Sequence, residues 1–351
     1  MIRVGCIGLG YWGPNLLRVL TQVPEAEVIV VCDRDRRRAA AVAKQLVQES
    51  AITDDVREVF NEPDVDAVVI ATPTPTHFTL ARAALVTGKH VFVEKPLATT
   101  VAECDKLIEL AAAKGLVLMV GHVFEYNAAV LRVKEYLRAG QLGALLYIHS
   151  RRTNLGRIQG DLNALWSFAP HDVSIINYWL DAEPLAVSAR GFSYLHPDRA
   201  DVAFVTLTYP DNVRAHLHLS WLDPQKVREM TIVGSQQMLV YDDVSTDAKL
   251  QLYDKGVMRI QEQAAEGVSD FGEFQLQVRT GDVVVPYLEF PEPLKEECRH
   301  FLTCIERGEV PRSDGASGRR VVKVLEACQR SLKQDGQTIS LERRPSALVR
   351  A

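Results

Sequence analysis

Three glycines and an aspartate near the start of the chain have a spacing that suits ligand binding. Gly8, Gly10 and Gly13 form G-x-G-x-x-G, and Asp33 lies twenty residues after Gly13. The first glycine permits a tight turn, the second lets a pyrophosphate approach the backbone, and the third allows a helix to pack closely on a strand. A carboxylate at the end of the second strand accepts hydrogen bonds from an adenosine ribose. We therefore expect a dinucleotide, with NAD favoured because Asp33 repels a 2′-phosphate, and NADP still open because of Arg34.

Polar residues also follow two later apolar segments. They are Thr72, Pro73 and His77 after the first segment, and Glu94 and Lys95 after the second. Lys95 stands between an apolar strand pattern and Pro96, so partial removal from water would lower the pKa of its amine toward a useful range. On this ground alone, catalysis and a local role are both open for Lys95. His77 lies at the start of a predicted helix, where its side chain either forms hydrogen bonds with its own loop or contacts the cofactor.

Residues 1–121 alternate apolar strand patterns with helical patterns, which predicts a doubly wound parallel sheet of the Rossmann type. The carboxyl ends of its strands should carry the ligands. The predicted strands are Ile2–Ile7, Val28–Cys32, Ala67–Ala71, Val91–Val93 and Val117–Gly121, and the predicted helices are Leu16–Thr21, Arg37–Gln48, Asp55–Phe60, Thr76–Thr87 and Ala102–Lys114.

The pattern changes after Gly121, so residues 122–351 form a second predicted domain of the α+β class. Its sheet should be large, open and mixed or antiparallel, with helices on one face, and the late helices are free to pack back on the first domain. The predicted strands are Leu145–Arg152, Leu185–Phe192, Val202–Tyr209, Val213–Ser220, Arg228–Gly234 and Met238–Tyr241, and the predicted helices are Ala128–Leu137, Asp172–Leu180, Leu294–Arg307 and Gly315–Lys333, followed by a frayed tail in the 340s.

Composition narrows the class of protein. With 351 residues, a net charge of −5 and a pI of about 6.0, the chain is an ordinary globular one and an improbable ligand for nucleic acid. It has no apolar stretch of membrane-spanning length and begins directly in a strand pattern, so we expect neither a membrane anchor nor a signal peptide. The six cysteines lack C-x-x-C spacing, which predicts buried thiols in the reducing cytoplasm and no metal site.

Several motifs at these positions resemble those of the Gfo/Idh/MocA family, which includes glucose–fructose oxidoreductase and inositol 2-dehydrogenase. They are G-L-G-Y-W-G-P-N at Gly8–Asn15, A-T-P-T-P-T-H at Ala71–His77, E-K-P-L-A at Glu94–Ala98, G-H-V-F-E-Y-N at Gly121–Asn127 and A-P-H-D at Ala169–Asp172. The resemblance spans both predicted domains. It implies an NAD(P)-dependent oxidoreductase acting on a sugar, cyclitol or nucleotide-linked sugar, with Lys95 and His171 as catalytic residues.

The resemblance also implies two sets of binding residues. The cofactor set is Gly8, Gly10, Tyr11, Trp12, Gly13, Asp33, Arg34, Thr72, Pro73, His77, Glu94, Lys95 and Asn127. The substrate set is Lys95, Asn154, Trp166, Ser167 and His171.

One residue departs from the family pattern. Where many members have an aspartate four residues before the histidine, this chain has Ser167, which carries no charge near neutral pH. Either Lys95 and His171 act alone, or Asp161 or Asp172 compensates, or redox activity is lost. The last alternative is a non-catalytic dinucleotide- or sugar-binding regulator.

Two further expectations concern the second domain. Asp172 reads as the N-cap of its helix, and Arg151, Arg152 and Arg157 either grip an anionic substrate or lie at the surface. The segment Val213–Ser220 alternates apolar and polar residues, so one face of the sheet needs a cover. Because the family commonly associates through this sheet, we expect a homodimer or homotetramer.

Overall fold

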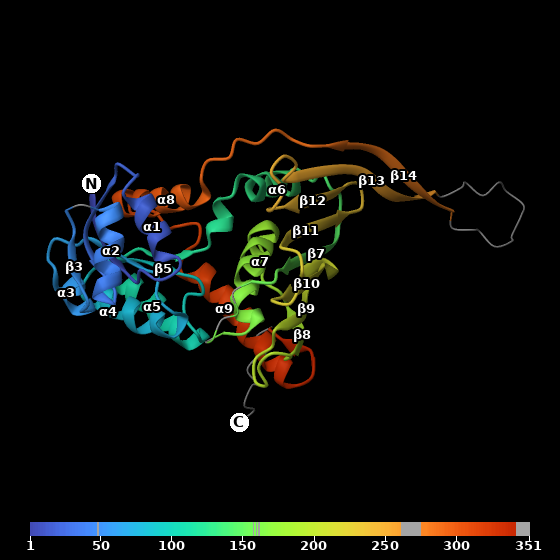
Figure 1. Ribbon diagram of the computed structural model, residues 1–351. Coiled ribbons are helices and arrows are strands. Elements are labelled where there is room, and N and C mark those ends of the chain that lie inside the picture. The colour runs from blue at the N-terminus through green and yellow to red at the C-terminus, as the bar shows by residue number, and fades with distance from the viewer. Residues whose placement is uncertain (48, 157, 159, 161, 261–274, 342–351) are drawn as a thin grey trace, which may run out of the picture. The chain divides into compact units, whose positions relative to one another are not determined.

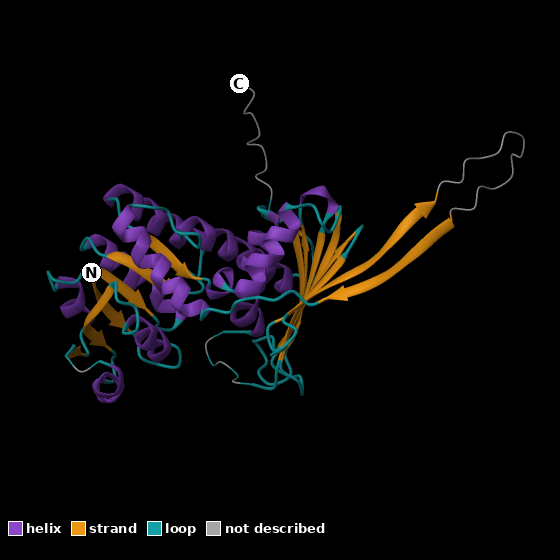
Figure 2. Cartoon of the chain, turned by 90° about the horizontal axis from the view of Figure 1, so that it is seen from above, coloured by secondary structure: helices purple, strands orange, loops and turns teal. Residues whose placement is uncertain are grey.

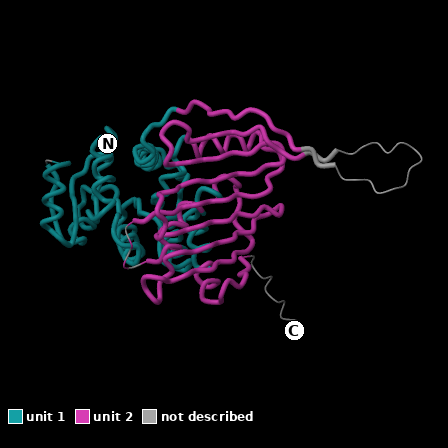
Figure 3. The backbone as a smooth tube through the Cα atoms, turned by 45° about the vertical axis from the view of Figure 1, so that its right-hand side comes forward, with its two compact units in different colours: residues 1–128, 173–176, 289–327 teal, residues 129–172, 177–288, 328–351 magenta. Residues whose placement is uncertain are grey.

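The computed structural model describes residues 1–341 apart from 48, 157, 159, 161 and 261–274. The chain divides into two compact units, coloured separately in Figure 3. The first contains residues 1–128, 173–176 and 289–327, and the second contains the remaining described residues.

The first unit is built on a parallel sheet of six strands in the order β3-β2-β1-β4-β5-β6. The strand order reverses between β1 and β4, which is where a doubly wound sheet opens a ligand crevice. This confirms the predicted fold class (Figure 1). The strands are β1 Ile2–Ile7, β2 Ala26–Cys32, β3 Ala51–Thr53, β4 Ala67–Ile70, β5 His90–Glu94 and β6 Leu118–Gly121, and the helices between them are α1 Gly13–Leu20, α2 Arg36–Leu46, α3 Val56–Asn61, α4 His77–Val86 and α5 Val101–Lys114.

Side chains next to the helix ends explain where several helices begin. Asp35 accepts hydrogen bonds from the first backbone N–H groups of α2, and Asp55 does the same for α3. Thr100 and Glu103 form a reciprocal capping box at the start of α5, and Gly115 ends that helix in a left-handed conformation. The predicted strand list lacked β3, whose three residues are too short to show a pattern.

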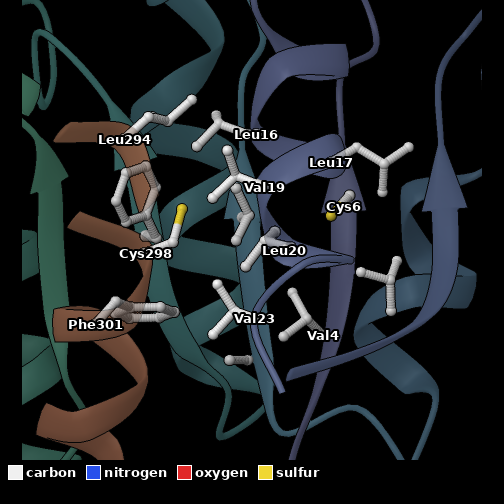
Figure 4. Close-up of a cluster of buried hydrophobic side chains, with 14 of the residues drawn as sticks. Val4, Cys6, Leu16, Leu17, Val19, Leu20, Val23, Leu294, Cys298 and Phe301 are labelled. Atoms are coloured by element: carbon white, nitrogen blue, oxygen red, sulfur yellow. The ribbon is translucent and has the colours of Figure 1, made fainter. Parts of the chain in front are cut away.

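A late helix belongs to the core of the first unit. α8 (Pro293–Arg307) places Leu294, Cys298 and Phe301 at helical spacing against the apolar residues of β1 and α1, as Figure 4 shows. The ring of Phe301 also meets that of Phe92 on β5 edge to face, with centroids 5.7 Å apart. The first unit is therefore completed by residues about 280 positions downstream of its glycine loop.

The second unit contains a mixed sheet of nine strands in the order β14-β13-β12-β11-β7-β10-β9-β8-β15. β7 and β10 run parallel to each other, and all other neighbouring strands run antiparallel. This confirms the predicted large, open, mixed sheet. The strands are β7 Leu145–Thr153, β8 Ala186–Phe192, β9 Val202–Thr208, β10 Arg214–Ser220, β11 Val227–Gly234, β12 Met238–Asp242, β13 Leu250–Ile260, β14 Gln275–Val284 and β15 Ile339–Ser340.

Helices α6 (Ala128–Arg138) and α7 (Ala164–Leu180) lie on one face of this sheet, which is seen edge-on in Figure 2. On β10, Ala215, Leu217 and Leu219 are buried on the helix side, whereas His216 points to the exposed side. No helix of the described part of the second unit covers that exposed side. The remaining long helix, α9 (Gly315–Lys333), begins in the first unit and ends in the second.

Two expectations for the second unit were wrong. α7 begins at Ala164 and not at Asp172, because Asn163 caps it through the Trp166 N–H and the helix continues through Pro170. Asp172 is therefore a mid-helix residue and not an N-cap. The strands β13 and β14 were not predicted at all, and the expected frayed tail from 342 onward lies outside the described residues.

We expect Phe301→Ala to lower the free energy of unfolding of the first unit. Truncating a fully buried phenylalanine costs about 3–5 kcal/mol through lost contacts and the cavity left behind, and Phe301 has 0% exposure. Denaturant unfolding followed by circular dichroism measures the change. Val310→Ala, at an exposed position beyond α8, is the control. Equal stabilities of the two variants would contradict the placement of α8 in this core.

Candidate active site

The glycine loop has the backbone that a bound pyrophosphate requires. Gly8 follows β1 with φ of 90°, a conformation that suits glycine. A Cβ on Gly13 would overlap the carbonyl oxygen of Gly8, so only glycine allows α1 to start this close to the strand. A Cβ on Gly10 would meet nothing within 4 Å, which leaves the open approach that a ligand needs. The loop therefore fits a dinucleotide phosphate at the start of α1.

Asp33 links the glycine loop to the end of β2. Its Oδ2 atom accepts the Leu9 N–H at 2.8 Å and its Oδ1 atom accepts the Asp35 N–H at 2.9 Å. A carboxylate has about four acceptor positions, so lone pairs remain for ribose hydroxyls. Arg34 is exposed, and the guanidinium of Arg38 lies 3.4 Å from Oδ1.

His77 holds together the loops after β4 and β5. Its Nδ1 atom lies 2.8 Å from the carbonyl oxygen of Pro96, and its Nε2 atom lies 2.8 Å from that of Thr72. The ring is buried, which lowers its pKa, and both nitrogens face backbone carbonyls. Of the two roles considered for His77, hydrogen bonding within its loop and contact with the cofactor, these contacts correspond to the first. Pro73 immediately follows Thr72 and leads into the short 3-10 helix η1, Thr74–Thr76.

Glu94 links the end of β5 to the glycine loop. Its Oε2 atom accepts the N–H of Lys95 at 3.2 Å, and its carboxyl group also receives a hydrogen bond from the side chain of Trp12. Burial raises the pKa of Glu94 to about 7, and the charge of Lys95 opposes that shift. Tyr11, next to Trp12, is 78% exposed at the mouth of the glycine loop.

Sequence reasoning included Glu94 but missed three buried titratable groups that form a cluster with it: His122, Glu125 and Glu297. Glu94 and Gly121 are the last register pair of β5 and β6, so Lys95 and His122 directly follow the ends of neighbouring strands. Burial, together with the charges of Lys95 and Arg320, lowers the pKa of His122 to about 3. The sequence signal for His122 is that of a polar residue directly after a buried apolar strand.

Two more acids belong to this cluster. Glu125 lies in the 3-10 helix η2 (Val123–Tyr126), and burial raises its pKa to about 8. Glu297 lies in the apolar face of α8, where burial and the charges of Glu94 and Glu125 raise its pKa well above the usual range. Among the described residues, neither carboxyl oxygen of Glu297 has a hydrogen-bond partner. Asn127, predicted to bind cofactor, is buried directly after η2.

The second unit brings together the predicted substrate residues of α7. Ser167 and His171 are four residues apart on one continuous helix, so they share a face. Ser167 is 7% exposed and His171 is half-buried. The indole N–H of Trp166 donates to the Gln329 side chain at 3.1 Å. Asn154 follows β7, and its backbone N–H donates to the Ser220 carbonyl.

For Arg152 the structure removes one of the two alternatives. Arg152 is buried and paired with Asp172, so it is not a surface charge. Arg151 is partly exposed and lies 3.1 Å from a carboxylate oxygen of Asp223. Arg157 and Asp161 lie outside the described residues.

Two family models match most of the sequence. Residues 2–122 match a model described as an oxidoreductase family with an NAD-binding Rossmann fold, and residues 130–240 match the GFO/IDH/MocA C-terminal domain. The chain belongs to the Gfo/Idh/MocA oxidoreductase family. Membership makes it an enzyme that uses NAD, and it supports this reading over the non-catalytic regulator that Ser167 left open.

Individual relatives of this Gfo/Idh/MocA protein cover nearly all of it. UDP-N-acetylglucosamine 3-dehydrogenase of Acidithiobacillus ferrooxidans is 27% identical over 322 residues, which are 92% of this chain and 94% of the relative. Its solved structure has a TM-score of 0.78 at 26% identity and covers 96% of this chain and 99% of its own.

Two other relatives are similar. A solved protein of Magnetospirillum magnetotacticum MS-1, described as an oxidoreductase, has a TM-score of 0.76 at 30% identity, covering 93% of this chain and 99% of its own. Inositol 2-dehydrogenase of Acidothermus cellulolyticus is 32% identical over 226 residues, which are 62% of this chain and 66% of the relative.

All six cysteines are buried and unpaired, as predicted. Within the described ranges, the structure contains no helix that is both long enough and apolar enough to span a bilayer.

The buried acids should make stability depend on pH. Because the pKa of Glu125 rises from 4.5 to about 8 on folding, ionisation destabilises the folded state as pH rises between these values. Glu125→Gln removes that loss, so the variant should match the wild type near pH 5 and exceed it near pH 8, on the order of 1–4 kcal/mol. Thermal unfolding at both pH values measures this, with the exposed Glu109→Gln as control. If the stability difference between Glu125→Gln and the wild type were the same at pH 5 and at pH 8, the raised pKa of Glu125 would be contradicted.

Proposed function

We propose that this enzyme moves a hydride between NAD and a carbon that carries a hydroxyl or keto oxygen in a sugar, cyclitol or nucleotide-linked sugar. The observation that carries the proposal is the position of Lys95, at the carboxyl end of β5 in the same sheet whose β1 leads into the glycine loop. A ligand in the crevice of such a sheet lies over these strand ends.

The residues proposed to hold the cofactor are those of the glycine loop and the neighbouring strand ends. Gly8, Gly10 and Gly13 take the pyrophosphate at the start of α1, and Asp33 takes the adenosine ribose. The carboxylate favours NAD, since it repels a 2′-phosphate. When bound, NAD supplies the acceptor or donor of the hydride.

Lys95 is proposed to move the proton that accompanies the hydride. In the oxidative direction the neutral amine accepts the proton of the reacting hydroxyl while the hydride leaves the same carbon, so a carbonyl forms. In the reverse direction the ammonium group returns the proton to the oxygen. Glu94, which receives the Lys95 N–H and the Trp12 side chain, helps to fix the backbone at this point.

Ser167 and His171 are proposed to contact the substrate from α7. A serine hydroxyl both donates and accepts a hydrogen bond, which suits a neutral sugar hydroxyl. His171 is the second candidate for proton transfer. The relatives point to the substrate class: one nucleotide-sugar dehydrogenase aligns with 92% of the chain, and an inositol dehydrogenase aligns with 62%.

We further propose that the enzyme works in the cytoplasm as a homodimer or homotetramer. Six free, buried thiols suit a reducing compartment. The exposed side of the second sheet carries Tyr147 and Phe204, which are 44% and 48% exposed, and exposed aromatic side chains of this kind are enriched at protein interfaces.

The activity is tested by following the NADH absorbance band with UDP-N-acetylhexosamines, inositols and free aldoses. In the variant Lys95→Met, turnover with the accepted sugar should fall by about 10²–10⁴-fold, the usual contribution of proton transfer. NAD affinity, measured by calorimetry, should stay close to that of the wild type. Lys106→Met, at an exposed position on α5, is the control. Near-normal turnover of Lys95→Met would remove this residue from the mechanism.

The assembly is tested by light scattering at micromolar concentration. The wild type should have a dimeric or tetrameric mass, and Phe204→Asp should reduce it because a charge then replaces an apolar contact. Val86→Asp, at an exposed position on α4, should leave the mass unchanged. A monomeric wild type would refute the proposal.

A further inference from the structure

A buried ion pair connects the second sheet to the helix that carries Ser167 and His171. The side chains of Arg152 on β7 and Asp172 on α7 are 5% and 0% exposed. The Nε and Nη2 atoms of Arg152 both lie 2.7 Å from Oδ1 of Asp172. Asp172 directly follows His171, so this contact is made within the turn that carries the predicted substrate residues.

Further charged and polar groups surround the pair. On the neighbouring strand β11, Arg228 is the register partner of Arg152, and its guanidinium lies 3.5 Å from Oδ2 of Asp243. The hydroxyl of Tyr241 donates to Oδ1 of the same Asp243 at 3.2 Å. Burial raises the pKa of Asp172, and the charges of Arg152 and Arg228 oppose this shift.

Stability alone does not explain this arrangement. Desolvating two charged groups offsets most of their attraction, and well-packed apolar residues in their place are commonly as stable or more stable. What an apolar pair cannot supply is direction. Two N–H groups of one planar guanidinium fix the position of the carboxylate oxygen, and hence the rotation of the helix that carries it.

α7 needs such a connection at this turn. Pro170 lies inside the helix and has no N–H to donate to the carbonyl of Trp166. The missing bond would join Pro170 to Trp166, within the turn that runs from Ser167 to His171, so this turn has one backbone hydrogen bond fewer where the two predicted substrate residues must keep their common face. Asp172, which forms the ion pair with Arg152, lies two residues after Pro170.

We propose that Arg152 and Asp172 are positioning residues that hold the Pro170 turn of α7, so that Ser167 and His171 keep a fixed orientation toward the substrate. This inference rests on the proposed function for the role of Ser167 and His171. The ion pair itself does not touch substrate. It acts through the helix.

The test removes the pair without leaving a buried charge. In Arg152→Met/Asp172→Leu, the melting temperature should equal or exceed that of the wild type. Hydrogen exchange of the amides in residues 164–172, measured by mass spectrometry, should accelerate. kcat with the accepted sugar should fall about tenfold to a hundredfold, because a small misplacement of reacting groups has an effect of this size. The Kd for NAD should stay the same.

A matched control exists on the same helix and the same sheet. The hydroxyl of Tyr209 donates to Oδ1 of Asn177 at 2.8 Å, well beyond the proline. Tyr209→Phe should lower the melting temperature and leave both kcat and the exchange of residues 164–172 unchanged. If the double variant does not fold, Arg152→Lys decides, because it keeps the charge and loses the planar two-point contact. It should fold and still show faster exchange and lower kcat.

The proposal is overturned if the folded double variant has the same kcat and the same hydrogen exchange as the wild type. If the double variant does not fold, the same result in Arg152→Lys overturns it. If no sugar is turned over by the wild type, the proposed function fails. The exchange measurement then still decides whether the pair holds the Pro170 turn.

Discussion

The parallel hydrogen-bond ladder of the first sheet is the constraint on which the cofactor residues depend. Six strands that run in one direction bring their carboxyl ends to one edge, and β1, β2, β4, β5 and β6 end there in the glycine loop, Asp33, Thr72, Glu94 and Gly121. Residues separated by more than a hundred positions in sequence thus come to lie along the same edge of the sheet. The loops at this edge are then tied to each other by His77 and Glu94.

Burial of charge at the same edge has an energetic cost. Glu94, Glu125 and Glu297 are removed from water, and each has a raised pKa because the ionised form is poorly solvated there. Replacing such acids by neutral residues should stabilise the fold. Acids whose pKa values are shifted by burial and by neighbouring charges are typical of active sites, and Glu94 directly precedes Lys95.

Local patterns predicted much of the fold and of the cofactor residues. The glycine spacing, the strand ending at Asp33, and the alternation of β10 each depend on residues close in sequence, and the structure confirms the fold that follows from them. The roles of the individual site residues stay predictions. The start of α7 was wrong because Pro170 and Asp172 together look like the beginning of a helix. The structure shows instead that Asn163 caps the helix and that Asp172 is occupied by Arg152.

What the sequence could not show depends on contacts between distant segments. Glu297 reads as an ordinary polar residue of an amphipathic helix until α8 is seen in the core beside Glu94, some two hundred residues earlier. The pairing of Arg152 with Asp172 likewise requires the packing of α7 on β7. The strands β13 and β14 were not predicted because their apolar alternation is short and is interrupted by Gly256 in β13 and by Gly281 in β14, and because they pair with each other along much of their length.

The central claim is direct hydride transfer from a sugar carbon to NAD in an enzyme of this fold. It is tested by supplying the accepted sugar with deuterium on the reacting carbon, in ordinary water, and analysing the reduced cofactor by mass spectrometry. The account predicts that the label moves into the reduced nicotinamide ring. Recovery of the label in water, with none in the cofactor, would contradict it.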